Sequence, residues 1–218
     1  MEKYSISSLN KVVRGSKRAT YDVATVHAIL DDAFLCHIGY VYQNQAIVIP
    51  IAYARKGDVI YIHGSLKNRM LLSLLEAGTA SLTVTHLDGL VLARSAFHHS
   101  ANYRSVTVFG SVNRVEEPKD KMEALKTIVD QMIPNHWDTT RQLSEKELNA
   151  TLVIAIQIET AAAKIRAEGA VDEVGDYDLP IWAGVIPLKQ KALAAISDDK
   201  LLDSIKIPES VTNYIKTH

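Results

Sequence analysis

Hydrophobic positions along the first third of the chain follow the pattern of short strands. Three runs are rich in Ile, Val and Tyr, and the turn-forming stretches "YQNQ" and "RKGD" separate them. Runs of this length and composition, bounded by turn residues, predict β-strands joined as hairpins rather than βαβ units. The three predicted strands are "AFLCHIGYV" (residues 33–41), "QAIVIPIAYA" (45–54) and "DVIYIHG" (58–64).

Helical spacing of apolar residues appears at only a few places. Capping residues, a proline that opens a helix and a glycine that closes one mark the ends of these segments. The predicted helices run from a cap at Thr20 to about Asp32, over residues 66–76 before Gly78, from Pro118 to about Met132, and over residues 144–149.

Later parts of the chain return to the strand pattern. Residues 79–87 and 90–97 flank Asp88-Gly89, a dipeptide that favours a tight hairpin turn. Residues 103–116 predict one long strand, and residues 150–167 predict a final long strand. The sequence therefore predicts a mainly β fold, an antiparallel barrel of six or seven strands with peripheral helices.

Length and composition indicate one soluble domain. The chain has 218 residues, with a polar arm expected over 1–19 and a tail over 171–218. A net charge of −1 gives no basic face for nucleic acid or an anionic membrane. The N-terminus has no secretory pattern, so we expect a cytoplasmic protein. The lone Cys36 lies in an apolar run and fits a buried hydrophobe, and the eight histidines show no metal-ligand spacing.

The junction between the strand at 58–64 and the helix at 66–76 carries unusual charge. With Ser65 as the predicted N-cap, Lys67 and Arg69 fall in the first helical turn, where the helix dipole disfavours cations. Two exposed cations there oppose folding by roughly 1–2 kcal/mol, whereas a bound anion would reverse the sign. We therefore predict that residues 63–69 bind a phosphate, with Gly64 giving close approach or an unusual dihedral angle.

Three other features admit more than one interpretation. Pro50 inside a strand indicates an edge, a bulge or a place where a flat ligand replaces a neighbouring strand. Arg104, in the polar cluster at residues 98–105, is either a surface residue or a contact for a second phosphate or a partner. Trp182, between Pro180 and Gly184, packs on the barrel or lies against a ring system.

These motifs together resemble the pyridoxamine 5′-phosphate oxidase-like flavin-binding proteins, in particular the branch that includes nitroimidazole-resistance proteins. The resemblance is carried by "IVIPIAY", "VIYIHGSLKNRML", "YRSVTVFGSVNRVE" and "IWAGVIPL", and it runs from about Arg14 to Leu188. It implies a split β-barrel, a homodimer, and FMN bound between the two subunits. No arginine follows Trp182, so the resemblance does not extend to the substrate-binding stretch of true pyridoxamine phosphate oxidases.

The resemblance also implies which residues bind FMN. Lys67 and Arg69 would hold the phosphate, with Ser65 beside it. The ring or the ribityl chain would lie along the preceding strands, and the second polar cluster and the tail would complete the site. The residues implied for these contacts are Val48, Pro50, Ile51, Tyr53, His63, Gly64, Ser100, Tyr103, Arg104, Ser105 and Trp182.

Function is expected to follow from the cofactor. The leading hypothesis is an FMN-dependent oxidoreductase acting on a small molecule, in which His63 either delivers a proton or makes a structural hydrogen bond. The alternatives are a non-catalytic flavin- or haem-binding protein, since related split barrels bind haem, and a regulatory dimer without a ligand.

Overall fold

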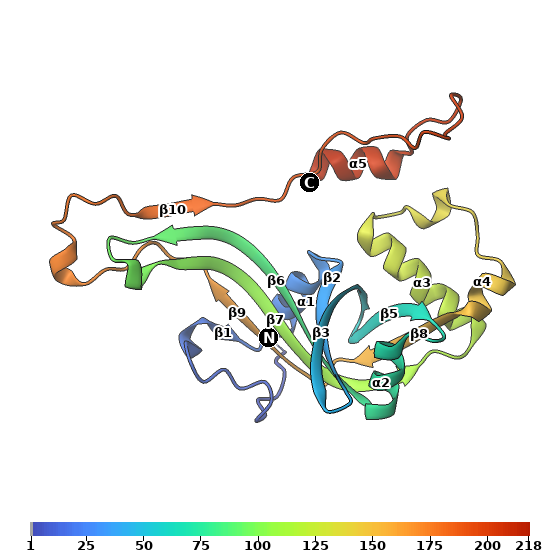
Figure 1. Ribbon diagram of the computed structural model, residues 1–218, viewed down its shortest axis with the longest axis horizontal. Coiled ribbons are helices and arrows are strands. Elements are labelled where there is room, and N and C mark those ends of the chain that lie inside the picture. The colour runs from blue at the N-terminus through green and yellow to red at the C-terminus, as the bar shows by residue number, and fades with distance from the viewer. Residues whose placement is uncertain (1) are drawn as a thin grey trace. The chain divides into compact units, whose positions relative to one another are not determined.

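The computed structural model describes residues 2–218, which form two compact units (Figure 1). Each unit is assembled from three separate segments of the chain. Unit 1 comprises the N-terminal segment to Asp32, Ser81–Phe109 and Glu159–Lys189. Unit 2 comprises Ala33–Ala80, Gly110–Ile158 and Gln190–His218. The expectation of a single domain remains a prediction.

Unit 1 is built on long antiparallel strands. Strand β10 (Gly184–Pro187) pairs with β6 (Thr79–Leu92), β6 neighbours β7 (Ser100–Arg114), and β9 (Thr160–Arg166) joins β7 to the short β1 (Ala19–Thr20). Helix α1 (Val23–Asp31) contacts β9. The buried hydrophobic residues of this unit include Val26, Leu30, Val84, Val91, Val106, Val108, Ala161 and Ala163.

Unit 2 contains two groups of antiparallel strands and most of the helices. Strands β2 (Leu35–Tyr42) and β3 (Gln45–Ala52) form a hairpin. The other group runs β4 (Ala54–Lys56), β5 (Val59–Ser65), β8 (Thr151–Gln157) and the end of β7. Its helices are α2 (Arg69–Ala77), α3 (Pro118–Met132), α4 (Glu145–Ala150) and α5 (Glu209–Thr217).

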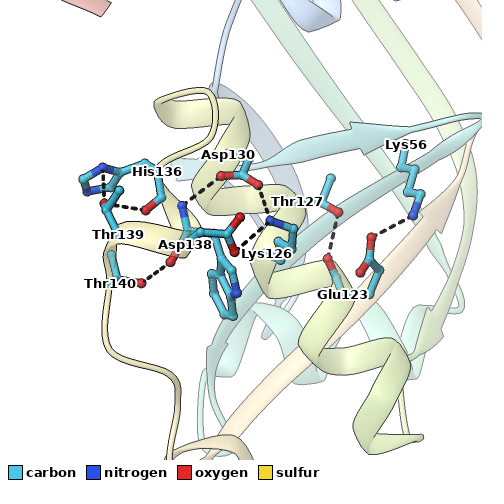
Figure 2. Close-up of polar contacts among 10 residues, drawn as sticks. Lys56, Glu123, Lys126, Thr127, Asp130, His136, Asp138, Thr139 and Thr140 are labelled. Atoms are coloured by element: carbon cyan, nitrogen blue, oxygen red, sulfur yellow. Dashed lines mark hydrogen bonds and ion pairs between the residues drawn. The ribbon is translucent and has the colours of Figure 1, made fainter. Parts of the chain in front are cut away.

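Helix α3 is held against this second strand group by a small apolar core. Its Ala124 and Leu125 pack with Trp137, Leu148 and Val153. Asp130 then fixes the loop that follows the helix: one carboxylate oxygen accepts from the Trp137 backbone N–H at 2.9 Å, and the other accepts from Lys126 at 3.0 Å (Figure 2). These polar contacts anchor the loop to α3.

Several predicted elements are confirmed. The hairpin turn between β2 and β3 is set by Gln43 and Asn44, both with positive φ. Gly78 ends α2 in the left-handed conformation, and Pro118 opens α3. Helix α4 starts one residue after its cap, Ser144. The fold class is confirmed as mainly antiparallel β with peripheral helices.

The predicted hairpin at Asp88-Gly89 is wrong. Strand β6 runs without a turn from Thr79 to Leu92. Gly89 lies opposite Pro187 of β10, and a Cβ atom there would come within 3.1 Å of the Ile186 carbonyl oxygen. The glycine therefore serves close approach of a neighbouring strand, which the dipeptide alone does not distinguish from a turn.

Two other boundaries differ from the prediction. Residues 150–167 form two strands instead of one, because β8 pairs with β5 whereas β9 pairs with β7 and β1. Helix α1 is capped by Asp22, whose carboxylate accepts from the Thr25 N–H, so Thr20 is not the cap. Residues 2–218 contain ten strands in all, short ones included. No helix in the same range is long and apolar enough to cross a membrane.

Candidate functional site

The β5–α2 junction differs from the predicted one in its register. Ser65 stays extended as the last residue of β5, opposite Thr151, and does not cap the helix. The cap is Asn68, whose side-chain oxygen accepts from the Leu71 N–H at 3.2 Å. A turn over Leu66 and Lys67, closed by the Asn68 N–H on the Ser65 carbonyl at 2.9 Å, joins the two elements.

This register changes the electrostatic argument. Arg69 is the first residue of α2, and Lys67 lies in the turn before the helix. The inference that two cations occupy the first turn is therefore wrong, and only one does. Gly64 has no positive φ; a Cβ atom there would lie 2.9 Å from the Asn68 side-chain nitrogen. The glycine thus makes room for the cap of α2.

Arg69 nonetheless has unusual surroundings. Its guanidinium group donates to the Tyr40 hydroxyl at 3.2 Å and lies over the Tyr42 ring, 4.6 Å from the ring centroid. Within residues 2–218, neither Arg69 nor Lys67 forms an ion pair with a carboxylate. The junction therefore presents two cations without a counter-charge beside the free N–H groups of a helix N-terminus, an arrangement that suits an anion.

His63 lies next to this junction, on β5. Its Nδ1 atom is buried and has no hydrogen-bond partner in the described structure. Burial lowers the pKa of its imidazole, because the charged form loses hydration. The ring is thus neutral near pH 7, with an Nδ1 atom that no described group pairs with.

Strand β3 belongs to unit 2 as well and is an edge strand. It pairs with β2 and contacts β5. The pairing of Pro50 with His37 falls in an uninterrupted register, so Pro50 is an edge residue and not part of a bulge. Val48 is 65% exposed, and Ile51 is half-buried. Tyr53 is fully buried in the core, so its side chain is not available at the surface for a ring system.

The residues predicted to complete the site lie in unit 1. Arg104 donates to both oxygens of Asp88 at 3.0 Å and to Asp32 at 2.7 Å. The hydrogen bonds to Asp88 raise the pKa of Arg104, which is therefore fully charged and already neutralised by carboxylates. The Ser105 hydroxyl donates to the Lys164 carbonyl at 3.3 Å. Arg104 is thus engaged with carboxylates of its own unit, and its assignment to the cofactor site stays a prediction.

Three further residues of unit 1 make no such network. Ser100 is exposed at the start of β7, and Tyr103 is half-buried opposite Arg166 of β9. Trp182 is 65% exposed and lies against Gly184, where a Cβ atom would come within 2.9 Å of the indole ring. An indole with this much free surface is available to a ligand or a second chain.

Two comparisons with known proteins establish the family. A family model described as pyridoxamine 5′-phosphate oxidase matches residues 22–165. The solved flavocytochrome Anf3 from Azotobacter vinelandii is 37% identical, with a TM-score of 0.90 over 95% of this chain and 97% of that one. This chain belongs to the pyridoxamine 5′-phosphate oxidase family.

Two other solved structures are also similar. The FAD and haem binding protein from Mycobacterium smegmatis is 31% identical, with a TM-score of 0.86 over 90% of this chain and 97% of that one. A candidate 5-nitroimidazole antibiotic resistance protein from Bacteroides thetaiotaomicron is 18% identical, with a TM-score of 0.58 over 67% and 86% of the chains, and shows the shared fold alone. No curated protein sequence matches the chain.

Sequence reasoning did not identify two residues that contact Arg69. Tyr40 and Tyr42 bring a hydroxyl and an aromatic ring to Arg69, although they lie 29 and 27 positions earlier in the chain. The alternation in "GYVY" places both on one face of a strand, which is a usable signal. Their contact with Arg69 depends on tertiary packing, which that alternation does not specify. Within residues 2–218, no group of three or more His, Cys, Asp and Glu side chains could hold a metal ion.

Proposed function

We propose that this protein binds a flavin nucleotide and a haem and works as a redox protein. One observation carries the proposal: the chain is similar over nearly its whole length to a flavocytochrome and to an FAD and haem binding protein. When bound, the flavin supplies two-electron redox chemistry and the haem iron supplies one-electron chemistry. Oxidoreductase activity toward a small molecule is part of this proposal.

The β5–α2 junction fits the phosphate of the flavin nucleotide. Lys67 and Arg69 supply charge that no carboxylate of the described chain neutralises, and the exposed Ser65 hydroxyl lies in the same turn. FMN and FAD both carry a phosphate at the end of the ribityl chain. Because the Mycobacterium smegmatis protein binds FAD, FAD is the first nucleotide to test, followed by the FMN that the resemblance implies.

His63 fits one of two duties. A neutral imidazole with a free nitrogen is able to serve as an axial haem ligand or to deliver a proton to a substrate. The variant His63→Ala separates the duties. Loss of the haem spectrum with flavin retained would assign His63 as the haem ligand. Lower turnover with both spectra intact would assign it proton delivery. Unchanged spectra and turnover would leave His63 with a structural role.

We also propose a homodimer with flavin at the subunit interface. Large apolar side chains are widely exposed in the tail of unit 2, among them Leu193 at 76%, Ile196 at 97% and Leu202 at 70%. Exposed apolar surface of this kind marks protein interaction sites. Light scattering on the full chain, with and without FAD, tests the proposal, and a monomer that binds FAD fully would overturn it.

The absorption spectrum of the purified full-length protein tests the main proposal. Reconstitution with FAD, FMN and hemin should give flavin bands and a Soret band, and both should respond to a reductant. Flavin bands without a Soret band would reduce the protein to a flavoprotein. A colourless protein that responds to none of the three would overturn the proposal and favour a regulatory dimer.

A further inference from the structure

Tyr40 and Tyr42 both contact the Arg69 side chain. They lie two residues apart on β2, so their side chains project from the same face of the strand. The hairpin turn follows immediately: Tyr42 pairs with Gln45, and Gln43 and Asn44 adopt the positive φ values of a tight two-residue turn. Tyr42 is thus fixed at the last pair of the hairpin.

The contacts of Arg69 hold its side chain but leave most of its donors free. One guanidinium nitrogen donates to the Tyr40 hydroxyl, and the planar group stacks over the Tyr42 ring. An arginine has five N–H donors, so the remaining ones are available to an anion in the fork geometry that suits phosphate. A flexible side chain would lose rotamer freedom on binding, whereas a stacked one has lost it already.

Tyr40 adds an independent sign of an anion. The residue is only 7% exposed, and its hydroxyl accepts a hydrogen bond from Arg69. The hydroxyl hydrogen has no acceptor among the described residues. A nearly buried phenol with an unused donor, beside a guanidinium without a counter-charge, is electrostatically incomplete. An anionic oxygen placed between them would satisfy both groups.

We propose that Tyr42 is a positioning residue and that Tyr40 is both a positioning and a phosphate-binding residue, and that together they hold Arg69 ready for the phosphate of a flavin nucleotide. The inference rests on the proposed flavin function and makes the pair a determinant of specificity for phosphorylated flavins over riboflavin. Tyr42 acts through stacking, and Tyr40 acts through its hydroxyl, which also donates to the phosphate.

Flavin titrations on the full-length protein test this assignment. FMN and FAD are each compared with riboflavin, which lacks a phosphate, in wild type, Tyr42→Leu and Tyr40→Phe. We expect each substitution to weaken binding of the phosphorylated flavins by about 3–10-fold. Riboflavin affinity and the melting temperature of the ligand-free protein should stay near the wild-type values.

A double-mutant cycle gives the sharper result. In an Arg69→Ala background, Tyr42→Leu should cause no further loss, because its effect passes through the guanidinium. Tyr42→Phe keeps the stacked ring and should bind as wild type does. Tyr177→Leu is the matched control, because it removes the ring under Arg94, an arginine already paired with Asp172.

The outcomes distinguish failure of the tyrosine positioning role from failure of the proposed phosphate site. Equal loss of riboflavin and nucleotide binding in Tyr42→Leu, or full additivity with Arg69→Ala, would overturn the positioning role. Wild-type affinity in both tyrosine variants would overturn it as well, while leaving the phosphate site intact. A wild-type protein that binds no flavin, or does not distinguish riboflavin from FMN and FAD, would overturn the proposed phosphate site itself.

Discussion

The family resemblance implies that Arg69 in unit 2 and Arg104 in unit 1 both contact FMN, and the structure gives them opposite surroundings. Arg104 makes three hydrogen bonds to the carboxylates of Asp88 and Asp32. Among residues 2–218, Arg69 forms no ion pair; it donates a hydrogen bond to the hydroxyl of Tyr40 and lies over the ring of Tyr42. An arginine paired with two carboxylates would have to give them up to bind a phosphate, whereas an arginine held by tyrosines would not.

The difference shows that availability of a cation is decided by its partners and not by its place in a motif. Both arginines stand where the family resemblance puts contacts to the cofactor. The hydrogen bonds that Arg104 donates to Asp88 raise the pKa of Arg104 and tie it to unit 1. Variants that change the surroundings of one arginine at a time therefore test whether its partners decide its availability to a phosphate.

The largest effect is expected from removing both cations of the junction. Lys67→Ala combined with Arg69→Ala should weaken FAD or FMN binding by at least about 100-fold, since two charge-assisted hydrogen bonds together contribute about 3 kcal/mol or more. Quenching of flavin fluorescence gives the affinity. Arg141→Ala, which removes an exposed arginine paired with Glu147, is the control and should bind normally. Unchanged affinity in the double variant would refute the phosphate site.

A smaller effect should follow from adding a negative charge without losing the cap. Asn68→Asp keeps an oxygen that accepts from the Leu71 N–H, so the melting temperature should hold or rise. The new charge should repel a phosphate and lower nucleotide affinity by about tenfold, or ~1.4 kcal/mol. Asn68→Ser supplies a cap without charge and should bind almost as wild type does. Equal affinity in the two variants would argue against an anion at the junction.

The converse change in unit 1 should affect stability rather than binding. Asp88→Asn weakens the paired hydrogen bonds of Arg104, which is still held by Asp32. Because the side chains of this pair are partly exposed, the expected loss is about 1 kcal/mol in the free energy of unfolding. Urea unfolding measures it, and flavin affinity should change by less than about twofold. A large loss of flavin binding would return Arg104 to the cofactor site.

The smallest effect concerns the pH dependence contributed by His63. Burial lowers the pKa of this imidazole in the folded state, so below its ordinary value of 6.5 the unfolded chain binds a proton more readily. Its contribution to stability is therefore full above pH 6.5 and declines as the pH falls toward the folded-state pKa. His63→Gln should flatten this part of the curve of melting temperature against pH. An unchanged slope would show that burial of His63 does not control it.

Much of the fold followed from sequence because local signals were decisive there. Pro118, Gly78 and the "YQNQ" turn each impose a local backbone geometry, and each element appeared as predicted. The failures came where tertiary pairing overrides a local preference. Asp88-Gly89 reads as a turn until β10 is known to lie opposite Gly89.

The candidate site was predictable in its residues but not in its contacts. Lys67 and Arg69 were found from charge and spacing and His63 from the family resemblance, and all three lie on one continuous stretch of unit 2. The cap at Asn68 was missed because pairing of β5 with β8 keeps Ser65 extended, and that pairing joins segments far apart in the chain. The same separation concealed the carboxylates of Arg104 and the tyrosines of Arg69.

The chain passes several times between the two units, and this affects how the protein folds during synthesis. Unit 1 needs its last strands before its sheet is complete, and its hydrogen bonds include one between Arg18 and Glu168, 150 positions apart. A growing polypeptide on the ribosome therefore cannot finish either half early, and contacts of such long range slow the search for the native state. No single proteolytic cut or truncation yields an intact half, so this molecule must be expressed, and must mature, as a whole.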